Sequence, residues 1–278
     1  MTMATIDGSM FDFRQLDLLA RGDTVIHRLD ARAKVLVVLL FIGSVVSFGR
    51  YELSAMVPFF LFPVVTVALA DLPAGFIVRK VVLVIPFAAA IGIFNPYFDR
   101  EVQLYIGSFT VSGGWLSCAS VVMRATLTVS AALLLVAVTG FPAICEALRR
   151  LGMPQALVVQ LLFMHRYLFV LAEDAARASR ARELRAFGAS GMGIGPFASM
   201  TGHLLLRSWE RAERIHMAML ARGFNGNFCL QRESLFGFKD LVFVAGWIVV
   251  FIILRSTNIP LLIGEAVSRL LSPWVLMP

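Results

Sequence analysis

The sequence predicts an all-α polytopic membrane protein with about five transmembrane helices and a large cytoplasmic helical region. Hydrophobic residues make up 59% of the 278 residues, charged residues only 15%, and the mean hydropathy is +0.81. This is far more apolar than one soluble core of that length requires, so a lipid bilayer is the expected solvent. The lengths of the apolar runs and the placement of the basic residues support the same fold class.

Five apolar runs are each close to the ~20 residues that cross the ~30 Å hydrocarbon layer of a bilayer. They are 33–48, 53–70, 81–98, 115–138 and 236–254. In the third run Pro86 predicts a kink, and Asn95 and Pro96 predict the end of the helix. The organisation that follows has an N-terminal cytoplasmic segment (1–32), helices 1–4 (33–140) with an outer loop (99–114), a cytoplasmic region (141–235), helix 5 (236–254) and an outer interfacial tail (255–278).

Basic residues set the predicted orientation in the cell (inner) membrane. The net charge is +7, which in a multi-pass protein indicates basic cytoplasmic loops and not nucleic-acid binding. Basic residues precede the first run, lie between the second and third at Arg79 and Lys80, and fill 149–239, whereas the opposite loops carry Arg50 and Arg100. All basic segments share one side when the N-terminus is cytoplasmic.

The stretch 157–171 is apolar enough to be counted as a sixth span. However, His165 and Arg166 lie at its centre, a depth at which charge is costly in a bilayer. Counting it would also move the arginines from Arg177 to Arg232 to the outside. We therefore predict a cytoplasmic helix packed under the membrane domain.

The outer loop and the tail give two smaller predictions. Apolar residues alternate on both sides of Gly107 and Ser108, which fit a two-residue turn, so a small extracytoplasmic β-hairpin is expected. In the tail, Glu265 and Arg269 are four residues apart, which suits a helix lying along the outer interface better than a span.

The cytoplasmic region is predicted to consist of helices. The first, 141–151, is stopped by Gly152 and Pro154, and two later helices are separated by a glycine-rich linker, 188–197. These glycines are not spaced as in a dinucleotide-binding turn. Each of these two later helices ends in an arginine that is followed by a glycine within three residues. Most arginines here fit a solvated, salt-bridged surface, but a guanidinium at a helix end also suits a partner's groove, where it binds carboxylates and carbonyls.

Four stretches, taken in order, carry a resemblance to a known family. They are HRLDARAK (27–34), SGGWLSCASVVMRATLTVSAALLL, LRRLGMPQALVVQLLFMHRYLFVL and ERAERIHMAMLARGF. Together they resemble the transmembrane coupling component of energy-coupling factor (ECF) transporters, of the CbiQ type associated with cobalt uptake. The resemblance covers most of the chain, from His27 to Leu254.

The resemblance implies that two helix ends, written Ala-Arg-Gly in the clearest members, dock into a pair of ATPase subunits. The second end matches fully as Ala221, Arg222 and Gly223. The first departs from the pattern, because ARELRAFG offers both Arg182 and Arg185 before Gly188. We favour Arg185, which lies closer to the helix end.

The implied mechanism transmits ATP-driven motion from two ATP-binding subunits to a separate substrate-binding membrane subunit. The chain itself is then no enzyme, with no catalytic, cofactor or metal residues. Two observations agree independently of the resemblance. The sequence has no GxxxxGK[ST], and its four histidines are scattered, without metal-ligand spacing. A structural role at the entrance of the first span is favoured for His27. Cobalt is the implied cargo, with nickel and vitamins left open because the cargo is chosen by another subunit.

Arg124 lies within the fourth apolar run, where an arginine is expensive unless it snorkels or pairs. A structural role in fixing helix packing is favoured over a role in substrate passage. Asn95, or a carbonyl freed by Pro86, is the expected partner.

Three alternatives stay open at this stage. An ordinary ABC importer permease also couples to its ATPase through a cytoplasmic loop, and EALRRLG (146–152) loosely resembles the Glu-Ala-Ala loop of that class. However, that class uses one coupling loop, whereas this chain offers two arginine-bearing helix ends. A vitamin-type ECF coupling component is closer. An intramembrane enzyme acting on lipid phosphates would need metal-binding acidic clusters, and Glu173 with Asp174 is the only adjacent acidic pair of the cytoplasmic region.

Overall fold

The computed structural model describes residues 15–95, 102–106, 109–185, 193–224, 226 and 236–256. Within these ranges the chain is helical apart from one pair of strands, which confirms the all-α polytopic fold class. The chain divides into two compact units. The bundle unit comprises 19–140 and 234–278, and the crossed-helix unit comprises 1–18 and 141–233.

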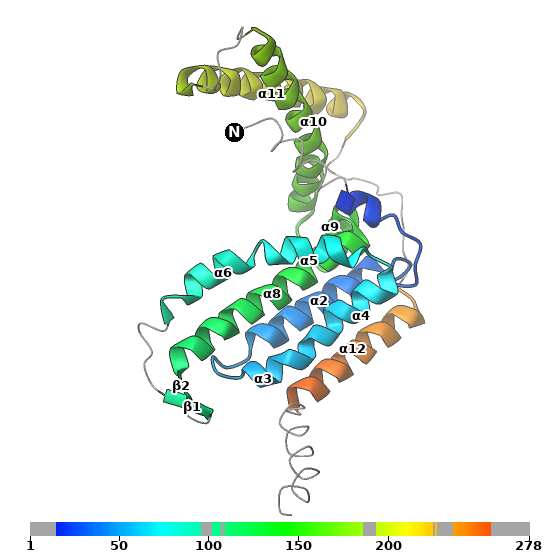
Figure 1. Cartoon of the computed structure of the whole chain (residues 1–278). Helices are drawn as coiled ribbons and strands as arrows, with labels where there is room; N and C mark the ends of the chain where they lie inside the picture. The colour runs from blue at the N-terminus through cyan, green and yellow to red at the C-terminus, as the bar shows by residue number, and fades with distance from the viewer. Residues whose placement is uncertain are drawn as a thin grey trace, which may run out of the picture. The chain divides into compact units, whose positions relative to one another are not determined.

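The bundle unit is a layer of apolar helices (Figure 1). Its elements are α2 (Ala31–Val46), α3 (Leu53–Met56), η1 (Val57–Phe60), α4 (Leu61–Ala70), α5 (Ala74–Val82), α6 (Ile85–Gly92), β1 (Val102–Ile106), β2 (Phe109–Ser112), α8 (Gly113–Thr139) and α12 (Phe238–Ser256). The helix α8 contacts α2, α4, α5 and α6, and α12 packs against the opposite side of α2. The strands β1 and β2 pair antiparallel, Ile106 opposite Phe109, which confirms the predicted hairpin.

Four helical stretches of the described residues are long and apolar enough to cross a membrane: Leu53–Ala70, Ala74–Gly92, Gly113–Thr139 and Gln155–Arg185. The first three correspond to predicted spans two, three and four. The helix α2 is shorter, with 16 residues, and α12 carries Lys239, Asp240 and Arg255. Since the fourth stretch also qualifies, its predicted place outside the bilayer rests on charge placement alone.

The third span differs from its predicted bounds. Its helix begins at Ala74 rather than near 81, so Arg79 and Lys80 lie in the last turn of α5 and not in a loop. The helix is interrupted after Val82 and resumes at Ile85, with Pro86 in the first turn of α6. Proline lacks an amide hydrogen, and the first turn of a helix is where this absence is tolerated. The sequence predicted a kink at Pro86, and the structure has a break in the helix just before it, at residues 83–84, while the predicted start was placed too late.

Aromatic rings form the centre of the bundle unit. Phe41 of α2 is fully buried and stacks on Phe62 of α4 at 4.6 Å between ring centroids. Phe251 of α12 lies 5.5 Å from Phe41, and Phe59 of η1 lies 5.9 Å from it. Tilted and offset ring pairs at these distances are favourable beyond their buried area. Phe41 of α2 thus contacts the consecutive segments η1 and α4 and also α12, which is distant from them in sequence.

The start of α2 is fixed by side chains of the HRLDARAK stretch. Asp30 caps the helix by accepting from the Arg32 amide at 2.8 Å. The Asp30 amide donates to Oδ1 of Asp240 at 2.7 Å, while Oδ2 of Asp240 accepts from the Gly237 amide at 2.8 Å. Both carboxylates are buried. A single carboxylate, that of Asp240, therefore joins the amino-terminal ends of α2 and α12.

The crossed-helix unit contains α9 (Phe141–Arg150), α10 (Gln155–Arg185) and α11 (Ile194–Ala221). The apolar stretch and the arginine-rich stretch form one continuous 31-residue helix, α10. The helix α11 begins at Ile194, inside the predicted glycine-rich linker of 188–197. Pro196 is tolerated there because the first turn needs no amide donors. Figure 1 shows α11 running across α10. The predicted interfacial tail was 255–278; Arg255 and Ser256 belong to α12, and the rest of the tail lies outside the described residues.

We expect Phe41→Ala to destabilise the bundle by about 3–5 kcal/mol, because it leaves a cavity where three aromatic partners meet. Leu39→Ala is the matched control on α2, since Leu39 is 54% exposed and should change stability little. Unfolding of the purified chain by SDS in mixed micelles measures both. Equal effects of the two substitutions would contradict the assignment of this core.

Candidate functional site

The end of α11 carries the predicted Ala-Arg-Gly sequence in a defined backbone motif. The Gly223 amide donates to the Leu220 carbonyl at 2.9 Å, and the Phe224 amide donates to the Met219 carbonyl at 3.0 Å. Gly223 has a φ of +77°. These two bonds and the left-handed residue form a Schellman motif, in which glycine avoids the Cβ clash of that conformation. The glycine of this sequence is thus required by how the helix ends.

Arg222 occupies the C-cap position of α11. Both Ala221 and Arg222 are exposed. A basic residue at a helix carboxyl end is favourable because that end carries partial negative charge. The guanidinium therefore lies at a rigid, glycine-terminated helix end and is accessible to a partner's acceptors.

The first predicted helix end is described only as far as Arg185, the last residue of α10. Arg185 is exposed, whereas Arg182, one turn earlier, is partly buried. Gly188 lies outside the described residues. Greater exposure and a terminal position both favour Arg185 as the more accessible of the two arginines.

The helices α10 and α11 are joined by an ion pair where they cross. Arg211 Nη1 of α11 lies 2.9 Å from Asp174 Oδ2 of α10. The other oxygen of Asp174 accepts a hydrogen bond from Arg177 on its own helix. The Asp174 side chain is only 13% exposed and that of Arg211 34%. One carboxylate consequently holds an arginine from each of the two helices.

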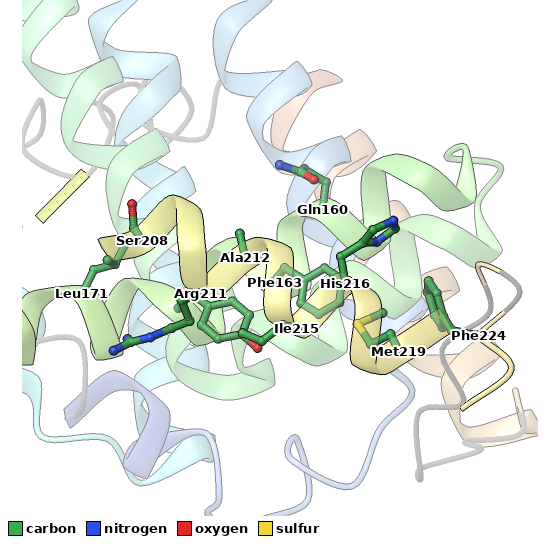
Figure 2. Close-up of a pocket in the computed structure, with 11 residues that line it drawn as sticks. Gln160, Phe163, Leu171, Ser208, Arg211, Ala212, Ile215, His216, Met219 and Phe224 are labelled. Carbon is green, nitrogen blue, oxygen red and sulfur yellow. The ribbon is translucent and has the colours of Figure 1, made fainter. Parts of the chain in front are cut away.

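A groove of about 470 Å³ runs along this crossing (Figure 2). Side chains of both helices line it: Gln160, Phe163, Tyr167 and Leu171 from α10, and Ser208, Arg211, Ala212, Ile215, His216 and Met219 from α11, with Phe224 after its end. Met219 and Phe224, which close the Schellman motif, lie together at one end of the groove, and Arg211 lies towards the other. The helix end and the groove are therefore parts of one structure.

His165, near the middle of α10, sits in an aromatic environment. Its ring stacks on Phe141 of α9 at 4.9 Å and meets Phe169 edge-on at 5.3 Å. Its Nε2 lies 3.4 Å from Asp17 Oδ2, a residue of the N-terminal segment. These contacts fasten the N-terminal segment and α9 to α10.

The helix α9 keeps its one carboxylate within its own last turns. Glu146 accepts from Arg149 at 2.6 and 2.8 Å and from Arg150 at 2.6 Å. The hydrogen bond from Arg149 is the main cause that lowers the pKa of Glu146 to about 2, with Arg150 adding to it. Since its folded pKa lies below its unfolded one, the carboxylate stabilises α9 above about pH 4.5 and loses this effect as the pH falls towards 2. The EALRRLG stretch is thus a self-paired helix end.

Arg124 contacts the turn that follows α2. Its Nη2 donates to the Phe48 carbonyl at 3.1 Å and, at 3.5 Å, to the Gly49 carbonyl. The predicted partners were wrong, because Asn95 instead donates to the Ser117 hydroxyl at 2.9 Å. The actual acceptors are backbone carbonyls of the turn just beyond α2, which ends at Val46. Nothing in the sequence marks these acceptors, since backbone carbonyls are common to every residue.

The ring of His27 is held on both sides by neighbours in sequence. Its Nε2 donates to the Leu19 carbonyl at 3.0 Å, which leaves Nδ1 to accept from the Thr24 hydroxyl at 2.7 Å. Burial lowers the pKa of His27 below its ordinary value, so the imidazole is neutral at pH 7. Within the described ranges, no group of three or more His, Cys, Asp and Glu residues is arranged to hold a metal ion.

Sequence reasoning missed two residues of this region. Phe224 could have been identified from the sequence, because an apolar residue directly after the terminal glycine is typical of a Schellman motif. Asp174 was noted only as an acidic neighbour of Glu173. Its pairing with Arg211 depends on how two helices cross, which no local pattern encodes.

The family described as CbiQ, cobalt transport protein, matches residues 22–233. The chain is similar to an uncharacterized protein of Methanocaldococcus jannaschii, with 31% identity over 109 residues, which cover 38% of this chain and 40% of that protein. A second uncharacterized protein of that organism is 22% identical over 238 residues, covering 81% of the chain and 80% of the relative. The cobalt transport protein CbiQ of Salmonella typhimurium is 29% identical over 161 residues, 53% of this chain and 71% of that protein.

We expect Gly223→Val to fray the end of α11, because a β-branched residue at a φ of +77° is strained by roughly 1–2 kcal/mol. Hydrogen exchange of the backbone amides of residues 223 and 224 should then be about 5- to 30-fold faster than in the wild type. Gly202→Ala is the matched control within α11, since a Cβ at Gly202 meets nothing within 4 Å. Unchanged protection in Gly223→Val would contradict the Schellman assignment.

Proposed function

This chain belongs to the CbiQ family of cobalt transport proteins, and on that premise we propose that it is the membrane coupling subunit of an ECF-type metal importer. It would transmit ATP-driven motion from two cytoplasmic ATP-binding subunits to a separate substrate-binding membrane subunit. The observation that carries the proposal is the exposed Arg222 at the glycine-terminated end of α11. Its counterpart is Arg185 at the end of α10.

The chemistry of the two ends suits insertion into a partner. A guanidinium presents several donors in one plane and binds carboxylates or carbonyls with two bonds at once. The Schellman motif fixes the backbone directly after Arg222, so that on binding only the arginine side chain has to become ordered. Two ends of this kind on one chain suit two equivalent sockets, such as those of a pair of related ATPases.

The crossed helices suit transmission of a displacement. If two ATPases move together on ATP binding, the docked ends of α10 and α11 move with them. Long helices move as rigid bodies, so displacement of one end rotates the helix about its fixed contacts. The substrate-binding subunit would receive this motion through the apolar surfaces of the same helices.

The proposal includes a topology with the N-terminus in the cytoplasm. Five spans then place the arginines of α10 and α11 on the cytoplasmic side, in accord with the distribution of basic residues. The helix α10 is long and apolar enough to span, but Arg166 lies near the middle of its apolar half. A crossing helix would have to bury this charge, which is costly, and would move the later arginines of α10 to the outside.

Cobalt is the favoured cargo, because the family that matches the chain is described by cobalt transport. The same family favours a transport component over a lipid-phosphate enzyme. An ordinary ABC importer permease is less well supported, because Glu146 is paired within its own helix while two separate arginine ends are presented.

We expect Arg222→Glu and Arg185→Glu each to reduce copurified ATPase at least about tenfold, since charge reversal leaves the socket's acceptors facing a carboxylate. The measurement is pull-down of a tagged chain expressed with its neighbouring genes, followed by ATP hydrolysis. Arg182→Glu decides which residue of the first end docks.

Arg214→Glu and Arg180→Glu are the matched controls. Both residues are exposed arginines on the same two helices and should retain the ATPase. If both Arg185→Glu and Arg222→Glu retain the wild-type amount of ATPase, the two arginines are ordinary solvent-exposed surface residues and the proposal is overturned.

We further propose that Arg124 has a structural role, as the donor that satisfies the end of α2. Arg124→Leu should strip the Phe48 carbonyl of its side-chain donor, at about 1–3 kcal/mol if the carbonyl stays buried. The amount of assembled complex and the uptake of cobalt should both fall. Arg50→Leu is the control in the same exposed turn, and normal assembly and uptake in Arg124→Leu would refute this role.

A further inference from the structure

The ion pair between Asp174 and Arg211 lies at a regular place in the two helices. Asp174 is eleven residues before Arg185, and Arg211 is eleven residues before Arg222. Eleven residues make three turns and about 16 Å of α-helix. Each docking arginine therefore lies near the helix face that carries the ion-pair residue, at the same distance from it along the helix.

The rest of the crossing is loosely packed. No residue of α11 is buried within the described chain, and the groove of about 470 Å³ separates side chains of the two helices along the crossing. Side chains that line an open groove lack the attractive contacts that fix close-packed helices. Away from the ion pair, packing between α10 and α11 therefore does little to fix the angle at which they cross.

We propose that the Asp174–Arg211 ion pair is the pivot on which α10 and α11 rotate as two equal arms that end in Arg185 and Arg222. This inference rests on the proposed function, because it assigns the residues that position the two docking ends. Equal arms convert a symmetric approach of two ATPases into rotation about one point. Asp174 and Arg211 are accordingly positioning residues, which act through the arginines that dock.

The shared carboxylate explains why the pivot tolerates rotation. Asp174 binds Arg177 with one oxygen and Arg211 with the other. The hydrogen bond from Arg177 stays within α10, whereas the ion pair between Arg211 Nη1 and Asp174 Oδ2, at 2.9 Å, joins the two helices. A guanidinium can swing about a carboxylate oxygen while it remains within bonding distance, because several of its N–H groups are equivalent donors.

The test measures the distance between the arms in the complete transporter. Spin labels are placed at Leu184 and Leu220, exposed residues at the ends of α10 and α11, in a chain whose Cys118, Cys145 and Cys229 are replaced by serine. Pulsed dipolar spectroscopy gives the distance distribution with and without ATP. Copurified ATPase and cobalt uptake per ATP hydrolysed are measured on the same preparations.

Asp174→Asn and Arg211→Gln should each broaden the distance distribution and lower cobalt uptake per ATP at least about fivefold. The ATPase should stay bound within about twofold of the wild-type amount, since both docking arginines are intact. The double variant should be no worse than either single one, because all three lose the same pair. Asp174→Glu, which keeps the carboxylate, should restore the narrow distribution.

Arg177→Gln is the matched control, because it removes a partner of the same carboxylate without touching the bond between helices. If Arg177→Gln lowers cobalt uptake per ATP as much as Arg211→Gln does, the pivot is overturned. It is also overturned if Asp174→Asn and Arg211→Gln both keep the wild-type distance distribution and the wild-type uptake per ATP. If the wild-type chain binds no ATPase, the proposed function fails. The pivot is then judged by the distances alone, and a narrow distribution in both variants refutes it.

Discussion

The helix α2 depends at both ends on polar side chains supplied by other helices. The carboxylate of Asp240 from α12 holds its first turn through the Asp30 amide, and Arg124 from α8 binds the carbonyls just beyond its last turn. Arg255 from α12 adds a bond to the Ser47 carbonyl at 3.0 Å and covers the Phe48 ring at 4.0 Å. In an apolar solvent an unpaired helix terminus is costly, so these contacts decide where α2 begins and ends.

The aromatic core follows from that constraint. Once both ends of α2 are fixed against α8 and α12, Phe41 can face only the rings of the adjacent helices, Phe62 and Phe251 among them. Packing alone specifies position weakly where the surrounding lipid is equally apolar. The polar contacts at the helix ends supply the register, and the rings then fill the space between.

Much of the fold could be read from the sequence, because apolar run length and turn residues are local signals. The span 53–70, an irregularity of the third helix near Pro86 and the hairpin around residues 102–112 were predicted in this way. The start of α11 was misplaced because glycines were taken as a linker, although Ile194 and Phe197 continue the helix. The partners of Arg124 lie about 76 residues away, and no property of the sequence selects particular carbonyls. The same distinction applies to the candidate site. The helix end at Gly223 is encoded by neighbouring residues, whereas the Asp174–Arg211 ion pair forms only when two helices cross.

Phe224 belongs both to the Schellman motif at the end of α11 and to the wall of the groove. Any group that occupies the groove and contacts Phe224 binds the ordered helix end more tightly than a frayed one. Thermodynamic linkage then requires the converse, that whatever orders this helix end raises affinity for the groove by the same factor. Phe224 therefore couples two events: binding in the groove orders the helix end that carries Arg222, and ordering of that helix end strengthens binding in the groove.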